Sequence, residues 1–407
     1  MQDKTRCVTR VPVSVEGFDS LTVPLYRAST IRYPDARSFM SRFERGADDY
    51  IYGLYGTPTH RYLEKKITEL EGGARTLLAP SGQAAITCSI LGVVETGDRV
   101  LIPDAVYGPV RDFAEHELVA LGIETVFYDP CDLQALEKEL ETKTRLVWVE
   151  SPGSVTMEMQ DVPAIVRMAH AKGSLVGCDN TWASPLNFKP LEHGADIVVE
   201  ALSKHFGGHS DLLMGSITVR DEQLGLDLKA VLGRLGIGTS PDDCVLVARG
   251  IDTLAVRLAH SAAGALKIAK WLQEQPLIEA VLHPELPGFS GHELWRRDFS
   301  GAAGVFSFTL HPEAMVHIPP ALDALELISI GASWGGTKSL IAPVDVKSLR
   351  TAKPWTGAEF ILRLSVGMEA ADDLVADLDR FLGVVRKNVS SNGEAEAMDH
   401  EVPEAAK

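Results

Sequence analysis

Residues 174–204 read SLVGCDNTWASPLNFKPLEHGADIVVEALSK and contain two short apolar runs, each ending in charged residues. The first run, SLVGC, stops at Asp179, and the second, DIVVEAL, stops at Ser203 and Lys204. Short apolar runs bounded by turn residues are typical of buried β-strands. We therefore predict two strands that bring a carboxylate and an amine to one edge of a sheet.

The same pattern recurs upstream of this stretch. Apolar runs occupy RVLIPD, ETVFYD and RLVWVE, and apolar residues at helical spacing mark 133–140 and 162–171. A further helix is predicted for THRYLEKKITELE, which two glycines follow as a stop signal. Strands that alternate with helices predict an α/β fold with a mostly parallel sheet covered on both faces. In such sheets, ligands bind at the carboxyl ends of the strands.

The chain divides by composition into four segments. Residues 1–45 lack periodicity and are predicted to form an arm that packs on a neighbouring subunit. Residues 46–240 hold the alternating pattern. Residues 241–388 are predicted to form a smaller C-terminal α+β domain, with one long helix at 248–272, strands in GVFSFTL and ILRLSV, and an amphipathic helix in DDLVADLDRFLGVV. Residues 389–407 are acidic and poor in large apolar side chains, which predicts a disordered tail.

Composition limits the possible functions. The chain has 407 residues, 45% of them hydrophobic, and a formal net charge of −17. This acidic excess argues against nucleic acids and membranes as partners, so we expect a small-molecule ligand. The five cysteines form no CxxC pair, which disfavours a disulfide framework and favours a reducing compartment. Without a signal peptide or an apolar run of membrane-spanning length, the sequence predicts a cytoplasmic protein.

Lys204 is the first candidate for chemistry. A lysine at the edge of a sheet, partly removed from water and near other cations, has a lowered pKa and becomes nucleophilic, which suits a Schiff base. Asp179 at the same edge could hold a pyridinium nitrogen protonated, as pyridoxal phosphate requires. Considered singly, each residue has a simpler role, as a solvated loop lysine and as a helix cap or turn residue.

A phosphate site is indicated by PSGQAA at 80–85. Gly82 lets the backbone approach an anion, and the free amides that begin the following helix favour a phosphate group. Tyr107 in DAVYGP lies just past a predicted strand. Its ring could stack on a planar ligand or remain a half-buried loop residue.

The motifs also follow the order of a known family. The series comprises YGLYGTPT at 52–59, SGQAA at 81–85, AVYGP at 105–109, ESPGS at 150–154, DNTW at 179–182, SKHFGGHSD at 203–211, SWGG at 333–336 and RLSVG at 363–367. It resembles the cystathionine β-lyase branch of the pyridoxal-phosphate-dependent cysteine and methionine metabolism enzymes. The resemblance runs from about residue 20 to 385. It implies the type I aminotransferase-like fold, with residues 46–240 as the cofactor-binding domain, and a homotetramer of catalytic dimers.

The resemblance implies a cofactor role for each matching residue. Lys204 would carry pyridoxal phosphate and move the Cα proton of the substrate. Asp179 would pair with the pyridine nitrogen, Tyr107 would stack on the ring, and Tyr52 would reach in from a neighbouring subunit. The cofactor phosphate would be held by Ser81, Gly82, Gln83 and Ser203.

Three further residues would bind the substrate. Arg363 would hold the α-carboxylate as a bidentate fork, with Ser333 and Trp334 nearby. Relatives that act at Cγ usually read SLGG and SPxNP where this chain reads SWGG and SPGS, so Trp334 favours cleavage at Cβ. Taken without the family, Trp334 has the simpler role of a packing residue in a glycine-rich loop.

The favoured activity is cleavage of L-cystathionine to homocysteine, pyruvate and ammonia by α,β-elimination. The alternatives are a β-lyase for another cysteine S-conjugate or cystine, and a Cγ-acting sibling such as cystathionine γ-synthase, cystathionine γ-lyase or methionine γ-lyase. A non-catalytic regulatory homologue is a further alternative. The intact set of cofactor and substrate residues argues against this last alternative.

Three positions depart from the family pattern. Leu54 stands where many relatives carry an arginine that pairs with the phosphate, Ala201 replaces a hydroxyl, and Lys338 replaces a common glutamate. Loss of one charge-assisted contact, about 1.5–3 kcal/mol, predicts weaker retention of the cofactor. Arg61 or His60 could compensate, although both are predicted on a solvated helix face.

His205 and His209 are four residues apart, as in some metal sites. The two glycines between them disfavour a helix, and no third ligand is suggested, so we predict no metal site. We expect His209 to hydrogen-bond within its own loop.

Overall fold

The computed structural model describes residues 16–17 and 19–399. Its main sheet has seven strands in the order β1-β7-β6-β5-β4-β2-β3. β7 runs antiparallel to both of its neighbours, and all pairs from β6 to β3 are parallel, which confirms the predicted sheet. The strands are β1 (Arg75–Ala79), β2 (Arg99–Pro103), β3 (Glu124–Tyr128), β4 (Leu146–Glu150), β5 (Leu175–Asp179), β6 (Ile197–Glu200) and β7 (Gly215–Val219).

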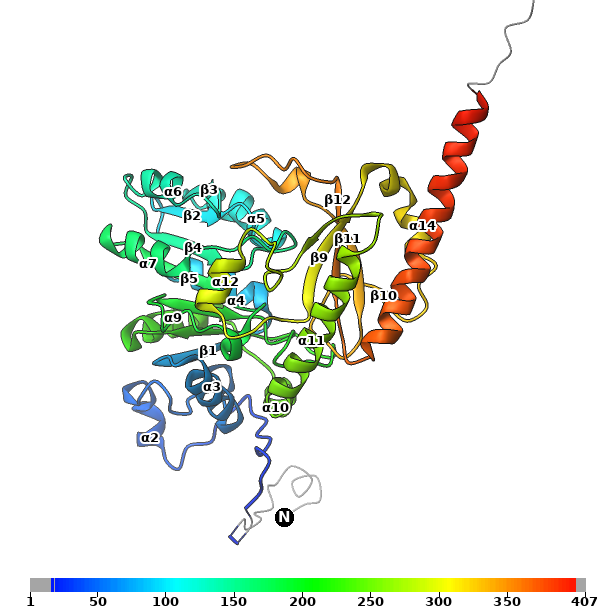
Figure 1. The fold of residues 1–407 in the computed structure, drawn as a ribbon. Helices are drawn as coiled ribbons and strands as arrows, with labels where there is room; N and C mark the ends of the chain where they lie inside the picture. Colours follow the sequence, from blue (N-terminus) through cyan, green and yellow to red (C-terminus); the bar gives the residue numbers. More distant parts are fainter. Residues whose placement is uncertain (1–15, 18, 400–407) are drawn as a thin grey trace, which may run out of the picture.

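Helices cover both faces of this sheet (Figure 1). Successive residues of one strand pack into different hydrophobic clusters, because side chains along a strand alternate between its faces. In β2, Leu101 belongs to one cluster, and Val100 and Ile102 belong to the other. The helices of this part of the chain are α3 (Pro58–Glu71), α4 (Gly82–Leu91), α5 (Gly108–Phe113), η3 (Ala114–Leu118), α6 (Leu133–Glu139), α7 (Val162–Ala171), α8 (Ser184–Asn187) and α9 (Glu222–Leu235).

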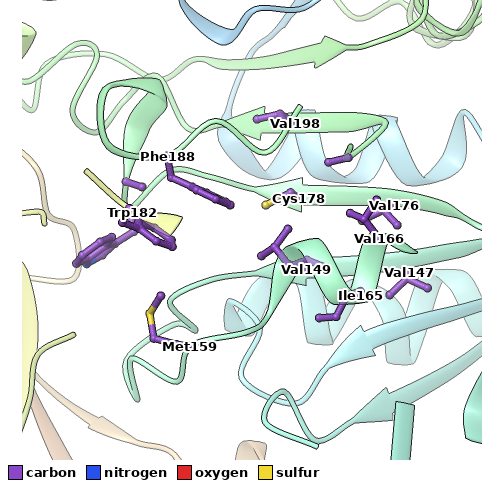
Figure 2. Close-up of a cluster of buried hydrophobic side chains, with 14 of the residues drawn as sticks. Val147, Val149, Met159, Ile165, Val166, Val176, Cys178, Trp182, Phe188 and Val198 are labelled. Atoms are coloured by element: carbon purple, nitrogen blue, oxygen red, sulfur yellow. The ribbon is translucent and has the colours of Figure 1, made fainter. Parts of the chain in front are cut away.

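Figure 2 shows the cluster on the α7 side of the sheet. Val149 of β4 and Cys178 of β5 pack with Val166 of α7, and Trp182 and Phe188 belong to the same cluster. The indole Nε1 of Trp182 donates a hydrogen bond of 2.9 Å to the carbonyl of Val305, which belongs to the second sheet. The first core therefore continues into the C-terminal part of the molecule.

The second sheet has five strands in the order β10-β11-β12-β9-β8. Its pairs are antiparallel except for the short pair of β10 and β11. The helices α11 and α14 contribute side chains to one core with β9, β11 and β12, which gives the smaller C-terminal α+β layer that the sequence predicts (Figure 1). Its strands are β8 (Ile278–Leu282), β9 (Val305–Leu310), β10 (Ser329–Ile330), β11 (Leu340–Asp345) and β12 (Phe360–Ser365). Its helices are α10 (Pro241–Ile251), α11 (Leu254–Gln273), α12 (His292–Asp298), η4 (Pro312–His317), α13 (Ile318–Leu322), η5 (Lys347–Leu349) and α14 (Ala371–Asp399).

Two internal elements differ from the prediction. The single helix expected at 248–272 is wrong, because Thr253 separates α10 from α11: its hydroxyl donates to the carbonyl of Gly250 and accepts from Nε of Arg257. β1 and β7 are not among the predicted strands. Their buried threonines, Thr76 and Thr218, face each other at 2.9 Å between the hydroxyl oxygens, so neither segment shows an unbroken apolar run.

At the N-terminal end, residues 16–45 include the short helices α2 (Ala36–Met40) and η1 (Arg42–Glu44), and the packing of this arm on a neighbouring subunit stays a prediction. The C-terminal end differs from the prediction. α14 continues to Asp399, so residues 389–399 are helical where a disordered tail is predicted. Glu, Ala and Met in this stretch are strong helix formers, which accounts for the difference. Residues 1–15, 18 and 400–407 lie outside the described residues, and among the described ones no helix has the length and apolarity needed to span a membrane.

Candidate active site

One cavity opens at the carboxyl ends of β4, β5 and β6. It has a volume of about 210 Å³, and apolar side chains line it together with a few converging polar groups, as in small-molecule sites. We call it the main cavity. Nine of the predicted site residues line it, namely Ser81, Gly82, Gln83, Tyr107, Asp179, Ser203, Lys204, Trp334 and Arg363.

Lys204 lies in the turn that follows β6. Its ammonium donates a hydrogen bond of 2.7 Å to the hydroxyl of Ser333 and lies 5.3 Å from the centre of the Trp334 ring. Burial, and then the nearby charge of Arg363, lower the pKa of Lys204 to about 8, against a smaller opposing effect of Asp179. About a tenth of this amine is therefore neutral and nucleophilic at pH 7, far more than for a lysine with the ordinary pKa.

Asp179 is the last residue of β5, and hydrogen bonds through Thr181 link it to Ala201, three residues before Lys204. Its Oδ1 accepts hydrogen bonds from the amide and the hydroxyl of Thr181, at 2.9 and 2.6 Å. The Thr181 hydroxyl oxygen in turn accepts the amide of Ala201, at 2.9 Å. Burial raises the pKa of Asp179, and the bonds from Thr181 and the charge of Lys204 oppose that shift. The Oδ2 atom is left for a ligand in the main cavity.

Tyr107 ends the loop between β2 and α5, and its backbone is held by Glu150. The Tyr107 amide donates a hydrogen bond of 2.8 Å to Oε2 of Glu150, which ends β4 and pairs in register with Asp179. Burial, and then the charge of Asp179, raise the pKa of Glu150 well above its ordinary value. Glu150 was not among the predicted site residues. Its signal was the ESPGS motif at the end of a predicted strand.

The anion site predicted at PSGQAA is the N-terminus of α4. The Ser81 hydroxyl oxygen caps the helix by accepting the amide of Ala84 at 3.0 Å. A Cβ added to Gly82 would lie 2.5 Å from the methyl carbon of Ala201, so only glycine lets the helix start this close to the Lys204 turn. The free amides of this end face the main cavity and can bind a phosphate.

Two predicted phosphate ligands already have partners. The Ser203 hydroxyl donates to the carbonyl of Met214 at 3.2 Å and accepts its amide at 3.0 Å. Nε2 of Gln83 donates to the carbonyl of Pro109, and Oε1 of Gln83 is buried without a hydrogen-bond partner in the described chain. Ser203 would have to release Met214 before donating to a phosphate.

Arg363 comes from β12 of the second sheet. Its guanidinium donates to the carbonyl of Ala332, which directly precedes Ser333 and Trp334. Burial lowers the pKa of Arg363. Among the described residues, Arg363 forms no ion pair with a carboxylate. Arg363 therefore presents a cation to the main cavity that suits a carboxylate.

Tyr52 is the predicted site residue that the structure places away from the main cavity. It precedes η2 (Gly53–Tyr55), and half of its surface is exposed. Leu54 lines a separate cavity beside α3 and α9. This segment does not contribute to the main cavity of its own chain.

The two residues considered as substitutes for a phosphate arginine have other contacts. The prediction of a solvated helix face is wrong for His60, which is buried and bonded through Nε2 to the carbonyl of Thr239 at 3.0 Å. Arg61 is largely covered, pairs with Glu64 and donates to the carbonyl of Tyr55. Neither side chain lines the main cavity.

The histidines after Lys204 serve the local structure. Nδ1 of His209 bonds to the carbonyl of Gly207 at 2.7 Å, which confirms the predicted hydrogen bond within the loop. His205 is buried with its ring 5.3 Å from that of Trp334. Between residue 16 and residue 399, the described side chains form no group of three potential metal ligands.

The sequence also matches a family model over nearly its whole length. The model describes the Cys/Met metabolism PLP-dependent enzymes, where PLP is pyridoxal phosphate, and it matches residues 4–383. The chain belongs to this family. Family membership makes the protein a PLP-dependent enzyme and accounts for its type I aminotransferase-like fold.

Curated relatives in this PLP-dependent family carry two kinds of name. The cystathionine β-lyase of Escherichia coli K12 is 38% identical over 87% of this chain and 91% of its own length. The L-alanine/L-glutamate racemase of Wolbachia pipientis wMel is 38% identical over 89% of this chain and 92% of its own. Among solved structures, the cystathionine γ-synthase of Xanthomonas oryzae pv. oryzae in complex with aminoacrylate and cysteine is 28% identical, with a TM-score of 0.85 over 91% of this chain and 95% of the other.

The residues of the main cavity fit the cofactor of the family. The cavity presents a lysine amine of lowered pKa, a buried carboxylate and a helix N-terminus, which match an aldehyde, a pyridine nitrogen and a phosphate. Gly82 supplies the space for this approach, since any larger residue would collide with Ala201.

Proposed function

We propose that this PLP-dependent enzyme is a carbon–sulfur β-lyase that cleaves L-cystathionine to homocysteine, pyruvate and ammonia. The observation that carries the proposal is the Lys204 amine, whose pKa is lowered to about 8, facing Asp179 and Arg363 across one cavity. Two curated relatives named cystathionine β-lyase, from Escherichia coli and Bordetella avium, are each 38% identical to the chain.

On the first-sheet side of the cavity, the residues would hold the cofactor. When bound, PLP supplies an electron sink for negative charge at the substrate Cα. Lys204 would bind its aldehyde, Asp179 its ring nitrogen and Tyr107 its ring face. Tyr52 would come from the neighbouring subunit, because it does not line the cavity of its own chain. The phosphate would be held at the start of α4 by Ser81, Gly82 and Gln83, with the Ser203 hydroxyl.

On the second-sheet side, the residues would bind the substrate and position it for removal of its Cα proton. Arg363 would bind the α-carboxylate, and Trp334 would cover the reacting face. Ser333, bonded to the Lys204 amine, would keep that amine oriented toward Cα. Lys204 would accept the Cα proton, the Cβ–S bond would break, and the sulfur would leave with the bonding electrons as a thiolate, to which Lys204 would return the proton to give homocysteine. The remaining enamine takes up water and yields pyruvate and ammonia.

A second candidate activity is amino-acid racemisation. The Wolbachia racemase is as similar to the chain as the Escherichia coli β-lyase is, at 38% identity. Racemisation needs the same removal of the Cα proton by Lys204, followed by its return on the opposite face. The two activities differ in whether the Cβ substituent is lost.

A panel of substrates separates these functions. We expect the holoenzyme to release pyruvate from L-cystathionine, with little 2-oxobutyrate from L-cystathionine or methionine and little D-alanine from L-alanine. Lys204→Ala should lose the visible absorbance of the bound cofactor and at least about 100-fold in pyruvate release, because the base is gone. Equal pyruvate release by wild type and Lys204→Ala would refute the proposed mechanism. Predominant 2-oxobutyrate or D-alanine would identify a Cγ-acting enzyme or a racemase instead.

The assembly and location of the enzyme are also proposals. A homotetramer of catalytic dimers is supported by Tyr52 and by the exposed apolar side chains of residues 21–62, which include Leu21, Phe39, Met40 and Phe43. A cytoplasmic location is supported by the four described cysteines, which are all unpaired.

A further inference from the structure

Two buried glutamates lie beneath the cofactor side of the main cavity. Glu71 is the last residue of α3, and Glu200 is the last residue of β6. Their carboxyl groups lie within hydrogen-bonding distance of each other, and Glu71 is 0% and Glu200 1% exposed. We call these two side chains the carboxyl pair. Neither of them lines the main cavity, so the carboxyl pair is separate from the residues proposed to touch the cofactor or the substrate.

The carboxyl pair lacks the partners that buried anions need. Among the described residues, no N–H or O–H group donates to either carboxyl oxygen of Glu71, and Glu200 accepts one such bond, from Asn180. No described cation forms an ion pair with the two glutamates: Lys189, whose charge acts on Glu71, pairs with Glu192 instead. Two adjacent buried carboxylates without a cation cannot both be ionised, so one proton lies between them.

Glu200 is tied to the residue that follows Asp179. Its Oε1 accepts a hydrogen bond of 3.1 Å from Nδ2 of Asn180, which also donates to the carbonyl of Phe188 at 2.9 Å. The backbone amide of Asn180 donates to the carbonyl of Val199, the residue before Glu200, at 3.0 Å. A backbone bond and a side-chain bond therefore fix the end of β6 to the end of β5, which carries Asp179.

Ala201 directly follows Glu200, and hydrogen bonds link it to both charged groups of the cofactor side. Its amide donates to the Thr181 hydroxyl oxygen at 2.9 Å, and that hydroxyl donates to Oδ1 of Asp179 at 2.6 Å. Its carbonyl accepts the amide of Lys204 at 2.9 Å. A shift of Glu200 would therefore displace both the carboxylate and the amine of the main cavity.

The titratable groups around the carboxyl pair, other than Lys189, are acidic. β5 places the carboxyl of Asp179 and the buried thiol of Cys178 near the pair, and the residue opposite Glu200 on β7 is the uncharged Ser216. Burial, and then the charges of the surrounding carboxyls, raise the pKa of Cys178 well above its ordinary value, so this thiol carries no charge. These surroundings favour a carboxyl pair that keeps a proton.

The same surroundings fix the pH range in which the proton is lost. Burial, and then the charges of Glu71 and Asp179, raise the pKa of Glu200 well above its ordinary value. Burial raises the pKa of Glu71 to about 8, against smaller effects of the bond to Glu200 and of Lys189. The carboxyl pair therefore keeps its shared proton at neutral pH and loses it as the pH rises through about 8.

We propose that the carboxyl pair shares one proton and that Glu200, held by this bond, positions Asp179 and Lys204 for the cofactor. The inference goes beyond the activity proposed above, because the β-lyase and the racemase reactions need the same cofactor. Once the shared proton is lost, two buried negative charges lie side by side and repel each other. The end of β6 then moves away from α3, and the cofactor is held less tightly.

Replacing the shared proton by an amide N–H tests this role. In Glu200→Gln, the amide oxygen can accept from Asn180 and the amide nitrogen can donate to Glu71, so the bond no longer requires the proton. The measurement is the dissociation constant of the cofactor, from its visible absorbance, at pH 7 and pH 9. We expect it to rise between these values about three- to tenfold more in wild type than in Glu200→Gln, because one proton with a pKa of about 8 contributes at most about tenfold at pH 9.

Two further variants complete this comparison. Glu69→Gln makes the same change at an exposed position of α3 and should behave as wild type. Glu71→Gln supplies the amide from the other side of the pair and should behave as Glu200→Gln, which keeps the inference testable if Glu200→Gln does not fold. The titrations of Lys204 and of the cofactor itself occur in all four proteins and cancel in the comparison. If the folded Gln variants of the pair showed the pH dependence of wild type, the positioning role would be overturned.

The shared proton can also be observed directly. A protonated carboxyl group has an infrared C=O stretching band that a carboxylate lacks. At pH 7, subtracting the spectrum of the double variant Glu71→Gln/Glu200→Gln from that of wild type should leave such a band, whereas subtracting that of Glu69→Gln should leave none. Absence of the band from the first difference would overturn the inference. Neither measurement uses turnover, so both results are independent of whether the enzyme releases pyruvate.

Discussion

The two sides of the main cavity are built in different ways. On the cofactor side, Lys204, Asp179 and Glu150 lie at or just beyond the ends of adjacent strands, and the register of β4 and β5 places Glu150 beside Asp179. On the substrate side, Arg363 reaches in from β12, and Trp334 lies on a loop. The first side depends on one sheet, whereas the second depends on how two sheets are held together. We therefore expect changes on the first side to affect chemistry and stability, and changes on the second to affect substrate binding.

Breaking the connection between the two sides of the cavity should have the largest effect of the changes considered, and it should lower the stability of the fold. Asp104 is buried and accepts the amides of residues 351–353 while pairing with Arg111. Asp104→Asn removes the buried carboxylate that pairs with Arg111 and leaves it only the more exposed Glu115, so the free energy of unfolding should fall by about 3 kcal/mol, as measured by urea denaturation. Asp323→Asn changes an exposed aspartate and serves as the control. A loss as small as that of the control would mean that the two sides do not depend on this pair.

A change confined to the substrate side should spare the cofactor. Arg363→Lys keeps the positive charge but loses the planar fork that binds a carboxylate through two bonds. We expect kcat/KM for L-cystathionine to fall about 10- to 100-fold, while the absorbance of the bound cofactor is retained. Arg380→Lys on α14, away from the cavity, should leave both unchanged. Loss of the cofactor band in Arg363→Lys would show that the two sides cannot be separated in this way.

A change beneath the cofactor side should give a smaller effect that depends on pH. Glu71 of α3 is buried next to the carboxyl of Glu200 at the end of β6, and burial raises the pKa of Glu71 above its ordinary value of 4.5. The folded protein therefore keeps a proton that the unfolded chain releases, so the free energy of unfolding decreases as the pH rises above about 4.5.

Glu71→Gln should weaken this dependence without abolishing it, because burial also raises the pKa of Glu200 well above its ordinary value. Relative to wild type, the variant should gain at least about 1 kcal/mol in the free energy of unfolding between pH 5 and pH 8, because one unit of pKa shift corresponds to about 1.4 kcal/mol. Thermal or urea denaturation at the two pH values measures the gain, and any cost of the amide that does not vary with pH cancels in the difference. The same substitution at the exposed Glu69 provides the control. An equal change in the free energy of unfolding at both pH values would mean that Glu71 is not the group that causes the pH dependence.

The cofactor side could be predicted from the sequence in more detail than the substrate side. β5 and β6 are short apolar runs with Asp179 and Lys204 at or just past their ends, so local pattern and the rule for parallel sheets placed both residues correctly at one edge. The role of Ser81 as the cap of α4 also follows from local sequence. These features depend on neighbours in the chain.

The features that the sequence did not predict depend on contacts between distant segments. The pairing of Thr76 with Thr218 joins residues 142 apart, and neither segment looks like a strand by itself. The link from Asp104 to Thr351 spans 247 residues, and Val155, with its positive φ, directly follows Ser154, whose amide donates to the carbonyl of the distant Ala105. The exposure of His60 was predicted incorrectly for the same reason, since its burial depends on the segment around Thr239.

The bonds at Asp104 also restrict how the molecule can move. Together with the pairs of Arg350 with Glu158 and of Lys353 with Asp129, they join the C-terminal sheet to the first sheet along one rim of the cavity. A hinge that opens the cavity cannot lie on this rim without breaking buried ion pairs. A motion that widens the cavity would therefore lie at the opposite rim, where the Lys204 amine lies 5.3 Å from the Trp334 ring and Gly335, with a φ of +82°, adopts a conformation that favours glycine.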